Sequence, residues 1–186
     1  MTTVEVATFD SLNPVNNSVL ATYPIYSQDD VQRVVTSAQS ACGGWRLLGF
    51  SGRRKVLLTW SKLLTDRIAE CAALISSETG KPTSDATLEA TLAIGHLSWA
   101  ARNAREVLRP QHRKSGILMA NMSATVQRSP VGVVGVIGPW NYPIFTPMGS
   151  IAYAFGWWKH RGIQTERIYP WGWCLVGQYV CRSCPR

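Results

Sequence analysis

Apolar side chains recur at helical spacing along three stretches of the chain before Pro110. The first stretch follows Ser27, whose hydroxyl and the carboxylate of Asp30 form a helix-capping pattern, and the Gly43–Gly44 pair is expected to end it. Its apolar positions are Val31, Val34, Val35, Ala38, Ala41 and Trp45. This spacing predicts an amphipathic helix that buries one face in a core.

The second and third helical stretches are longer. One begins near Ser51 and is closed by Thr79-Gly80-Lys81-Pro82; the other runs from about Ser84 to Val107. Their apolar positions are Val56, Leu57, Trp60, Leu63, Leu64, Ile68, Cys71, Leu74 and Ile75, and then Leu88, Leu92, Leu97 and Trp99. Each set predicts one continuous helix whose Trp and Leu side chains pack a core.

Extended segments are expected at three places. The turn-rich run from Asn13 to Val19 predicts a hairpin over residues 8–26, and residues 117–128 have an extended pattern. The β-branched run from Val131 to Ile137 predicts a buried strand. Pro139 and Pro143 then exclude a helix until after residue 143, so Asn141 is held at the carboxyl end of that strand, where open α/β sheets bind ligands.

Composition is that of a globular protein, with 46% hydrophobic and 16% charged residues among 186. The net charge of +8 divides evenly, because residues 155–186 carry five Lys or Arg against Glu166 and contribute +4. Without a basic stripe we expect no nucleic-acid binding. A signal peptide and the ~20-residue apolar run of a membrane span are both lacking, so a cytoplasmic protein without membrane contact is expected.

The order of these segments resembles the NAD(P)-dependent aldehyde dehydrogenase family over about residues 8–154. The specific part is Pro139-Trp140-Asn141-Tyr142-Pro143 after the Val-rich strand, and Glu78–Pro82 is a weaker match. The resemblance implies an α/β fold: a partial Rossmann-type domain with an N-terminal hairpin, helices and the first strands of an incomplete parallel sheet. Residues 1–154 would be the N-terminal part of such an enzyme, including an incomplete cofactor-binding domain.

The resemblance also implies roles for the residues around Asn141. In this family a Cys thiolate attacks an aldehyde, hydride passes to NAD or NADP, and water releases the carboxylic acid. Asn141 matches the amide that stabilises the oxyanion, and Tyr142 and Phe145 match positions at the aldehyde tunnel. Ile137, Gly138, Pro139 and Trp140 match the strand end along the dinucleotide. The alternatives are an Asx turn for Asn141 and core packing for Tyr142.

Several parts of the family's chemistry would come from sequence beyond this segment. They include the catalytic Cys, the general-base Glu and the Lys that contacts the cofactor ribose. We therefore expect a truncated aldehyde dehydrogenase that is inactive alone and does not bind NAD or NADP. The alternative is a non-catalytic fragment that associates with an intact aldehyde dehydrogenase, or with copies of itself, through the hairpin at residues 8–26.

The tail after Ala154 has a different character. Trp157, Trp158, Trp171 and Trp173 follow no helical or alternating period. Trp has the single codon TGG, and reading Gly156–Pro170 one base later permits V-G-G-N-T-A-V-F-K-P-S-E-Y-T-P, the expected family continuation. Residues 155–186 are thus interpreted as an out-of-frame tail, the product of a frameshift in a decayed gene or of a sequencing error.

The five cysteines leave one other interpretation open. Cys42 and Cys71 fall on helical patterns and are expected to be small buried hydrophobic residues. Cys181 and Cys184 have C-x-x-C spacing, with Cys174 and His160 upstream, which is the composition of a zinc module. A second ligand pair at zinc-site spacing is missing, so no metal is expected.

Overall fold

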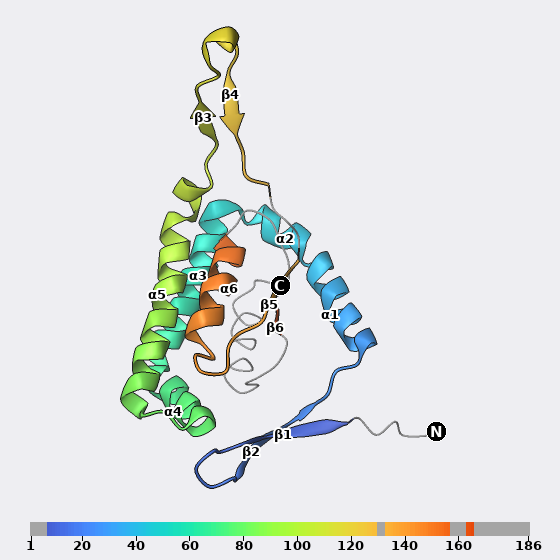
Figure 1. Cartoon of the computed structure of the whole chain (residues 1–186), viewed down its shortest axis with the longest axis vertical. Coiled ribbons are helices and arrows are strands. Elements are labelled where there is room, and N and C mark those ends of the chain that lie inside the picture. Colours follow the sequence, from blue (N-terminus) through green and yellow to red (C-terminus); the bar gives the residue numbers. More distant parts are fainter. Residues whose placement is uncertain (1–6, 130–132, 157–162, 166–186) are drawn as a thin grey trace.

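The computed structural model describes residues 7–129, 133–156 and 163–165 (Figure 1). The elements in chain order are β1 (Thr8–Leu12), β2 (Val19–Pro24), α1 (Gln28–Ser40), α2 (Cys42–Leu47), α3 (Gly49–Asp66), α4 (Ile68–Thr79), α5 (Thr83–Val107), β3 (Gln111–Arg113), a 3-10 turn (Ile117–Met119), β4 (Ala124–Val126), β5 (Val134–Val136), α6 (Phe145–Gly156) and β6 (Ile163–Thr165). None of the helices in these ranges is long and apolar enough to cross a bilayer.

The predicted hairpin at residues 8–26 is confirmed as the antiparallel pair β1–β2. Its turn is built by two Asx turns: Asn13 Oδ1 accepts the Val15 N–H at 2.9 Å, and Asn16 Oδ1 accepts the Ser18 N–H at 3.0 Å. Asn17 adopts a left-handed conformation with φ of 56°, which Asn tolerates better than most residues. Local side-chain hydrogen bonds thus explain why this turn could be predicted.

The first helical stretch begins where the sequence predicts but does not end there. Ser27 caps α1 in a full capping box with Asp30. The expectation that Gly43–Gly44 ends the helical run was wrong, because both glycines lie inside the short helix α2. The break comes earlier, between Ser40 and Cys42, and Trp45 is then buried from α2 rather than from α1.

The second helical stretch is two helices, so the prediction of one continuous helix was wrong. α3 ends at Asp66 and α4 begins at Ile68, and Arg67 between them has φ −119° and ψ 24°. Arg67 also pairs with Glu70 in the first turn of α4. The apolar spacing runs through this break, since Leu64 and Cys71 pack into the same core, and periodicity therefore gave no sign of it.

α5 confirms the third predicted helix, but of its four expected core positions only Leu97 is buried; Leu88, Leu92 and Trp99 are exposed. It packs against α3, α4 and α6 (Figure 1). Small side chains dominate its buried stripe: Ala86, Ala90, Ala93, Ala100 and Ala101. They let neighbouring helices approach closely, and Leu57, Trp60, Met148 and Ile151 fill the space between the helix axes.

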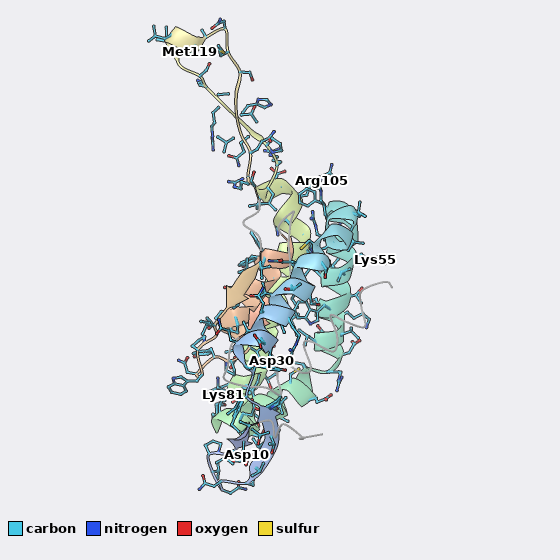
Figure 2. All side chains as sticks on the ribbon, turned by 90° about the vertical axis from the view of Figure 1, so that its right-hand side faces the viewer. Asp10, Asp30, Lys55, Lys81, Arg105 and Met119 are labelled. Atoms are coloured by element: carbon cyan, nitrogen blue, oxygen red, sulfur yellow. The ribbon has the colours of Figure 1, made fainter. Side chains whose placement is uncertain are left out.

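A second hairpin, β3–β4, projects away from the helices (Figure 1). Its tip is the 3-10 turn Ile117–Met119, so the expectation that residues 117–128 are extended holds only for β4 and its surroundings. In Figure 2 Met119 marks this tip, at the opposite end of the molecule from Asp10 and Lys81. Ile117 and Leu118 are each 96% exposed.

Of the buried strand predicted over Val131–Ile137, the structure describes β5 at Val134–Val136, where Val136 is buried, while Ile137 after it is exposed. β5 pairs in parallel with β6, which lies within residues 155–186, and Val134 pairs with Ile163. With two antiparallel hairpins, six helices and this short parallel pair, the described residues form the incomplete α/β architecture that the sequence predicts. α6 continues two residues past the expected boundary at residue 154, and the Phe155 ring packs against Trp45 and Trp60. Most of the proposed out-of-frame tail lies outside the described residues.

Candidate active-site loop

The loop between β5 and α6 carries Asn141 at the carboxyl end of a parallel strand. Val136 is buried against the helices, and the chain leaves the sheet through Gly138 and Pro139. A Cβ added to Gly138 would lie 2.9 Å from Cγ of Pro147 on α6, so only glycine fits this contact. The Asn141 side chain is exposed, whereas Pro143 and Ile144 directly after it are buried. The loop therefore presents an amide to solvent from a fixed base.

Two charged side chains from distant segments hold this loop. Lys81 Nζ lies 2.6 Å from Glu89 Oε2, donates a hydrogen bond to the Asn141 backbone oxygen at 2.8 Å, and sits 4.6 Å from the centre of the Tyr142 ring. The Glu89 side chain is fully buried and that of Lys81 is 17% exposed. An ammonium paired with a carboxylate and placed over an aromatic ring is electrostatically well matched.

Glu89 uses its second oxygen at the start of α6. Oε1 accepts the backbone N–H groups of Ile144 at 2.9 Å and Phe145 at 3.2 Å. The first N–H groups of a helix have no partner within the helix, and a carboxylate there also matches the helix dipole. Glu89 on α5 thus serves as the cap of α6, and one side chain joins two helices to the loop.

The Glu78–Pro82 segment delivers Lys81 to this position. Gly80 ends α4 in the left-handed conformation with φ of 73°, and a Cβ there would lie 3.2 Å from Pro14 of the β1–β2 turn. Ser76 Oγ holds the Lys81 backbone oxygen at 2.8 Å. Glu78 is buried and accepts a hydrogen bond from Ser11 of β1. The segment is therefore more than a helix stop, which was its interpretation from sequence.

The two expected tunnel residues lie in a continuous row of aromatic rings from the loop, α5 and α6. Tyr142 and Phe145 meet edge to face with centroids 6.3 Å apart, and Phe145 stacks on His96 at 5.1 Å. His96 Nδ1 lies 2.8 Å from the Tyr153 hydroxyl. Tyr142 is half exposed, so the alternative that it simply packs in the core does not describe its surroundings.

The expected cofactor residues directly precede Asn141 in the chain and follow β5. Ile137 is 75% exposed and Trp140 66% exposed, while Gly138 and Pro139 between them are half-buried. They form an exposed apolar strip at the carboxyl end of a parallel strand, where α/β sheets bind ligands, and their contact with a dinucleotide stays a prediction. These four residues, together with Asn141 and Tyr142, come from one short segment and are brought together by it.

The two described cysteines lie in helices, Cys42 at the start of α2 and Cys71 in α4. Burial raises the pKa of the Cys71 thiol, with the Glu70 carboxylate adding to this effect and Arg67 opposing it. Cys42 Sγ donates to the Ala38 backbone oxygen at 3.1 Å, as a thiol on a helix does. The alternative zinc module of Cys174, Cys181, Cys184 and His160 lies outside the described residues, within which no group of three metal-binding side chains occurs.

Sequence reasoning did not single out Glu89. A signal was present, because Glu89 lies within the buried stripe formed by Ala86, Ala90, Ala93 and Leu97 of α5. An acidic residue in an apolar stripe indicates a buried partner rather than a solvated face. The partner could not be deduced from spacing, since Ile144 is 55 residues away in the chain.

The chain is similar in sequence to known proteins over most of its length. The sequence model of the Aldehyde dehydrogenase family matches residues 2–156. The N-succinylglutamate 5-semialdehyde dehydrogenase of Chromobacterium violaceum is 32% identical over 159 residues, which are 86% of this chain and 32% of that protein. The malonate-semialdehyde dehydrogenase of Bacillus velezensis is 32% identical over 74% of this chain and 28% of its own.

Solved structures show the same fold. The succinate-semialdehyde dehydrogenase of Burkholderia pseudomallei superposes with a TM-score of 0.87 at 23% identity, over 97% of this chain and 37% of that one. An NAD-dependent aldehyde dehydrogenase of Sinorhizobium meliloti gives 0.82 at 27% identity, over 95% and 35%. The chain spans about a third of the length of the curated relatives it matches. On the strength of the family match over residues 2–156, this chain belongs to the aldehyde dehydrogenase family.

Proposed function

We propose that this chain supplies the oxyanion-stabilising part of an enzyme that oxidises an aldehyde to a carboxylic acid with NAD⁺ or NADP⁺. The observation that carries the proposal is the exposed amide of Asn141, on a clamped loop at the end of a parallel strand. When a Cys thiolate adds to the aldehyde carbon, the carbonyl electrons move to oxygen. The Asn141 N–H₂ group donates a hydrogen bond to that oxyanion without itself titrating.

Asn141→Ala tests this role in the complete enzyme obtained by restoring the family reading frame after residue 154. We expect kcat to fall by about 10²–10³, equivalent to about 2.7–4 kcal/mol, because one oxyanion donor is lost, while KM changes little. Asn121→Ala is a matched control, since Asn121 is exposed near the tip of the β3–β4 hairpin. An Asn141→Ala enzyme with unchanged kcat would refute the assigned role.

Ile137, Gly138, Pro139 and Trp140 would hold one side of the nicotinamide dinucleotide. That cofactor supplies the hydride acceptor when it is bound. Ile137 and Trp140 offer apolar surface, and Gly138 keeps the strand end against α6. Solved relatives include an enzyme complexed with NADP from Methanocaldococcus jannaschii and the NAD-dependent one from Sinorhizobium meliloti, so both cofactors remain within the proposal.

Tyr142 and Phe145 would line the mouth of the aldehyde tunnel, which the row of rings through His96 and Tyr153 makes largely apolar. Tyr142→Ala in the complete enzyme should raise KM for an aromatic or long-chain aldehyde more than for acetaldehyde. Equal changes for both substrates would remove Tyr142 from the tunnel.

The 186-residue chain by itself is proposed to be a truncated, inactive form that does not bind NAD or NADP. A buried thiol with a raised pKa, such as Cys71, is poorly suited as the nucleophile. The purified chain should produce no NADH or NADPH with any aldehyde and give no heat on titration with either cofactor. Reduction of NAD⁺ by the monodisperse chain would contradict this.

We further propose that residues 155–186 are an out-of-frame tail on residues 1–154, the remnant of a decayed gene or a sequencing error. The family match ends at residue 156, next to the expected boundary. Resequencing the gene across the codons for Ala154–Lys159 and past the stop decides this. If the added base is missing, the product is a longer dehydrogenase; if the expected family codons do not follow in the shifted frame, the frameshift proposal fails.

A second candidate function is association with an intact aldehyde dehydrogenase or with copies of this chain in a cytoplasmic setting. The observation that favours it is the group of exposed apolar side chains on the two hairpins: Leu12, Val15 and Val19 on β1–β2, and Ile117, Leu118 and Met122 on β3–β4. Light scattering should show an oligomer that dissociates in Val15→Asp. The variant Ile117→Asp tests in the same way whether the β3–β4 hairpin also contributes to the interface. A monomer at all concentrations that also fails to bind the complete enzyme would exclude this function.

A further inference from the structure

The Asn141 loop has two proline-fixed points and one free segment. Pro139 and Pro143 lock their own φ, and the proline at 143 restricts Tyr142 to extended conformations. Rotation therefore remains at Trp140 and Asn141. The hydrogen bond from Lys81 Nζ to the Asn141 oxygen fixes the peptide plane between Asn141 and Tyr142, which is the rotation that prolines leave open.

Glu89 fixes the other end of the same segment. Its Oε1 holds the N–H groups of Ile144 and Phe145, so the chain cannot slide along the α6 axis. Pro147 lies in the first turn of α6 and has no N–H, and its ring packs against Gly138 at the strand end. The loop is thus tied down at its entrance by Gly138, in its middle by Lys81 and at its exit by Glu89.

A buried ion pair contributes little net stability, because burying its charges offsets most of their attraction. Apolar side chains of similar size would fill this space as well. What they could not do is accept two helix N–H groups and donate to a loop carbonyl at the same time. What the Lys81–Glu89 pair does, and apolar side chains could not do, is hold residues 141–145 in place.

We propose that Lys81 and Glu89 are positioning residues for Asn141: Lys81 sets the orientation of the Asn141 peptide and Glu89 anchors the start of α6 beneath it. The inference rests on the proposed oxyanion role of Asn141, since a hydrogen-bond donor stabilises an oxyanion only if its place is fixed beforehand. The pair acts through the loop and touches no reacting atom.

The test measures backbone order and hydrogen exchange, both at single-residue resolution by NMR, in the 186-residue chain. In Lys81→Met the N–H order parameters of Trp140, Asn141 and Tyr142 should fall from about 0.85 to below about 0.6, because the bond that fixes the peptide between Asn141 and Tyr142 is lost. In Glu89→Met, which has a similar size but no oxygen to accept a hydrogen bond, the amides of Ile144 and Phe145 should lose protection from exchange. The amide of Leu97 in the core should keep its rate in both variants.

Lys62→Met is the matched control, because it breaks an exposed lysine pair with Asp66 on α3 and should leave the loop unchanged. Unaltered order at residues 140–142 in Lys81→Met, together with unaltered exchange at Ile144 and Phe145 in Glu89→Met, would overturn the proposal. Equal acceleration of exchange at Leu97 in the core would overturn it too, because that result means general destabilisation. The readout needs no catalysis. If Lys81→Met disorders the loop while the complete enzyme with Asn141→Ala keeps full activity, the oxyanion role is refuted and the positioning role stands.

Discussion

Two helix N-termini in this molecule are capped in opposite ways. α1 is capped by its own neighbours, because Ser27 Oγ accepts the Asp30 N–H and Asp30 accepts the Ser27 N–H in return. α6 is capped by Glu89, which belongs to another helix and lies 55 residues before Ile144. The first cap forms in any context; the second forms only when α5 and α6 pack. A local cap thus stabilises the start of a helix, whereas a remote cap also fixes the position of that helix relative to another.

Among substitutions at these two caps, Glu89→Ala should lower the free energy of unfolding most. Removal leaves Lys81 partly buried without its carboxylate and two N–H groups of α6 without an acceptor, so the free energy of unfolding should fall by about 3 kcal/mol. Urea denaturation measures it. Glu106→Ala on the same helix breaks an exposed pair with Arg109 and should change stability by less than about 0.5 kcal/mol. Equal effects of the two substitutions would show that the remote cap has no special weight.

Ser27→Ala breaks the local cap and should cost about 1 kcal/mol. The loss should be confined to α1, so amide exchange should accelerate from residue 28 to about residue 33 and stay unchanged in α6. Urea denaturation and exchange together check this. Acceleration in α6 as well would mean that the two caps are coupled and that the contrast between them is false.

The smallest expected effect comes from acid acting on the local cap. Hydrogen bonds from the Ser27 hydroxyl and backbone N–H, with Arg33 adding a coulombic contribution, lower the pKa of Asp30. A carboxyl whose pKa is lower in the folded state stabilises the fold above its unfolded pKa of about 4, and this contribution is lost as pH falls through the folded value. Stability measured from pH 6 down to pH 3 should fall less in Asp30→Asn than in the parent chain. An identical pH dependence would show that the cap is not ionic.

The contrast between the caps also explains what sequence could predict. The start of α1, the β1–β2 turn and the end of α4 depend on residues within a few positions, and the sequence predicts all three correctly. The break at Arg67 and the short helix through Gly43–Gly44 depend on packing that leaves the apolar spacing intact, and both were missed. Asn141 and its neighbours were found because one short segment holds them. Glu89 was not, because its partners are joined to it only by the fold.

The contacts that hold the Asn141 loop limit how it can be transferred to another protein. The segment from Gly138 to Phe145 is short and continuous, but three residues that hold it in place lie outside it: Pro147, Lys81 and Glu89. Transplanting the eight-residue segment alone would transfer the Asn141 amide without the contacts that fix its orientation. A working graft needs the α5 helix, the glycine-ended turn before it and the first turn of α6, so the smallest transferable unit is a three-helix corner of the fold.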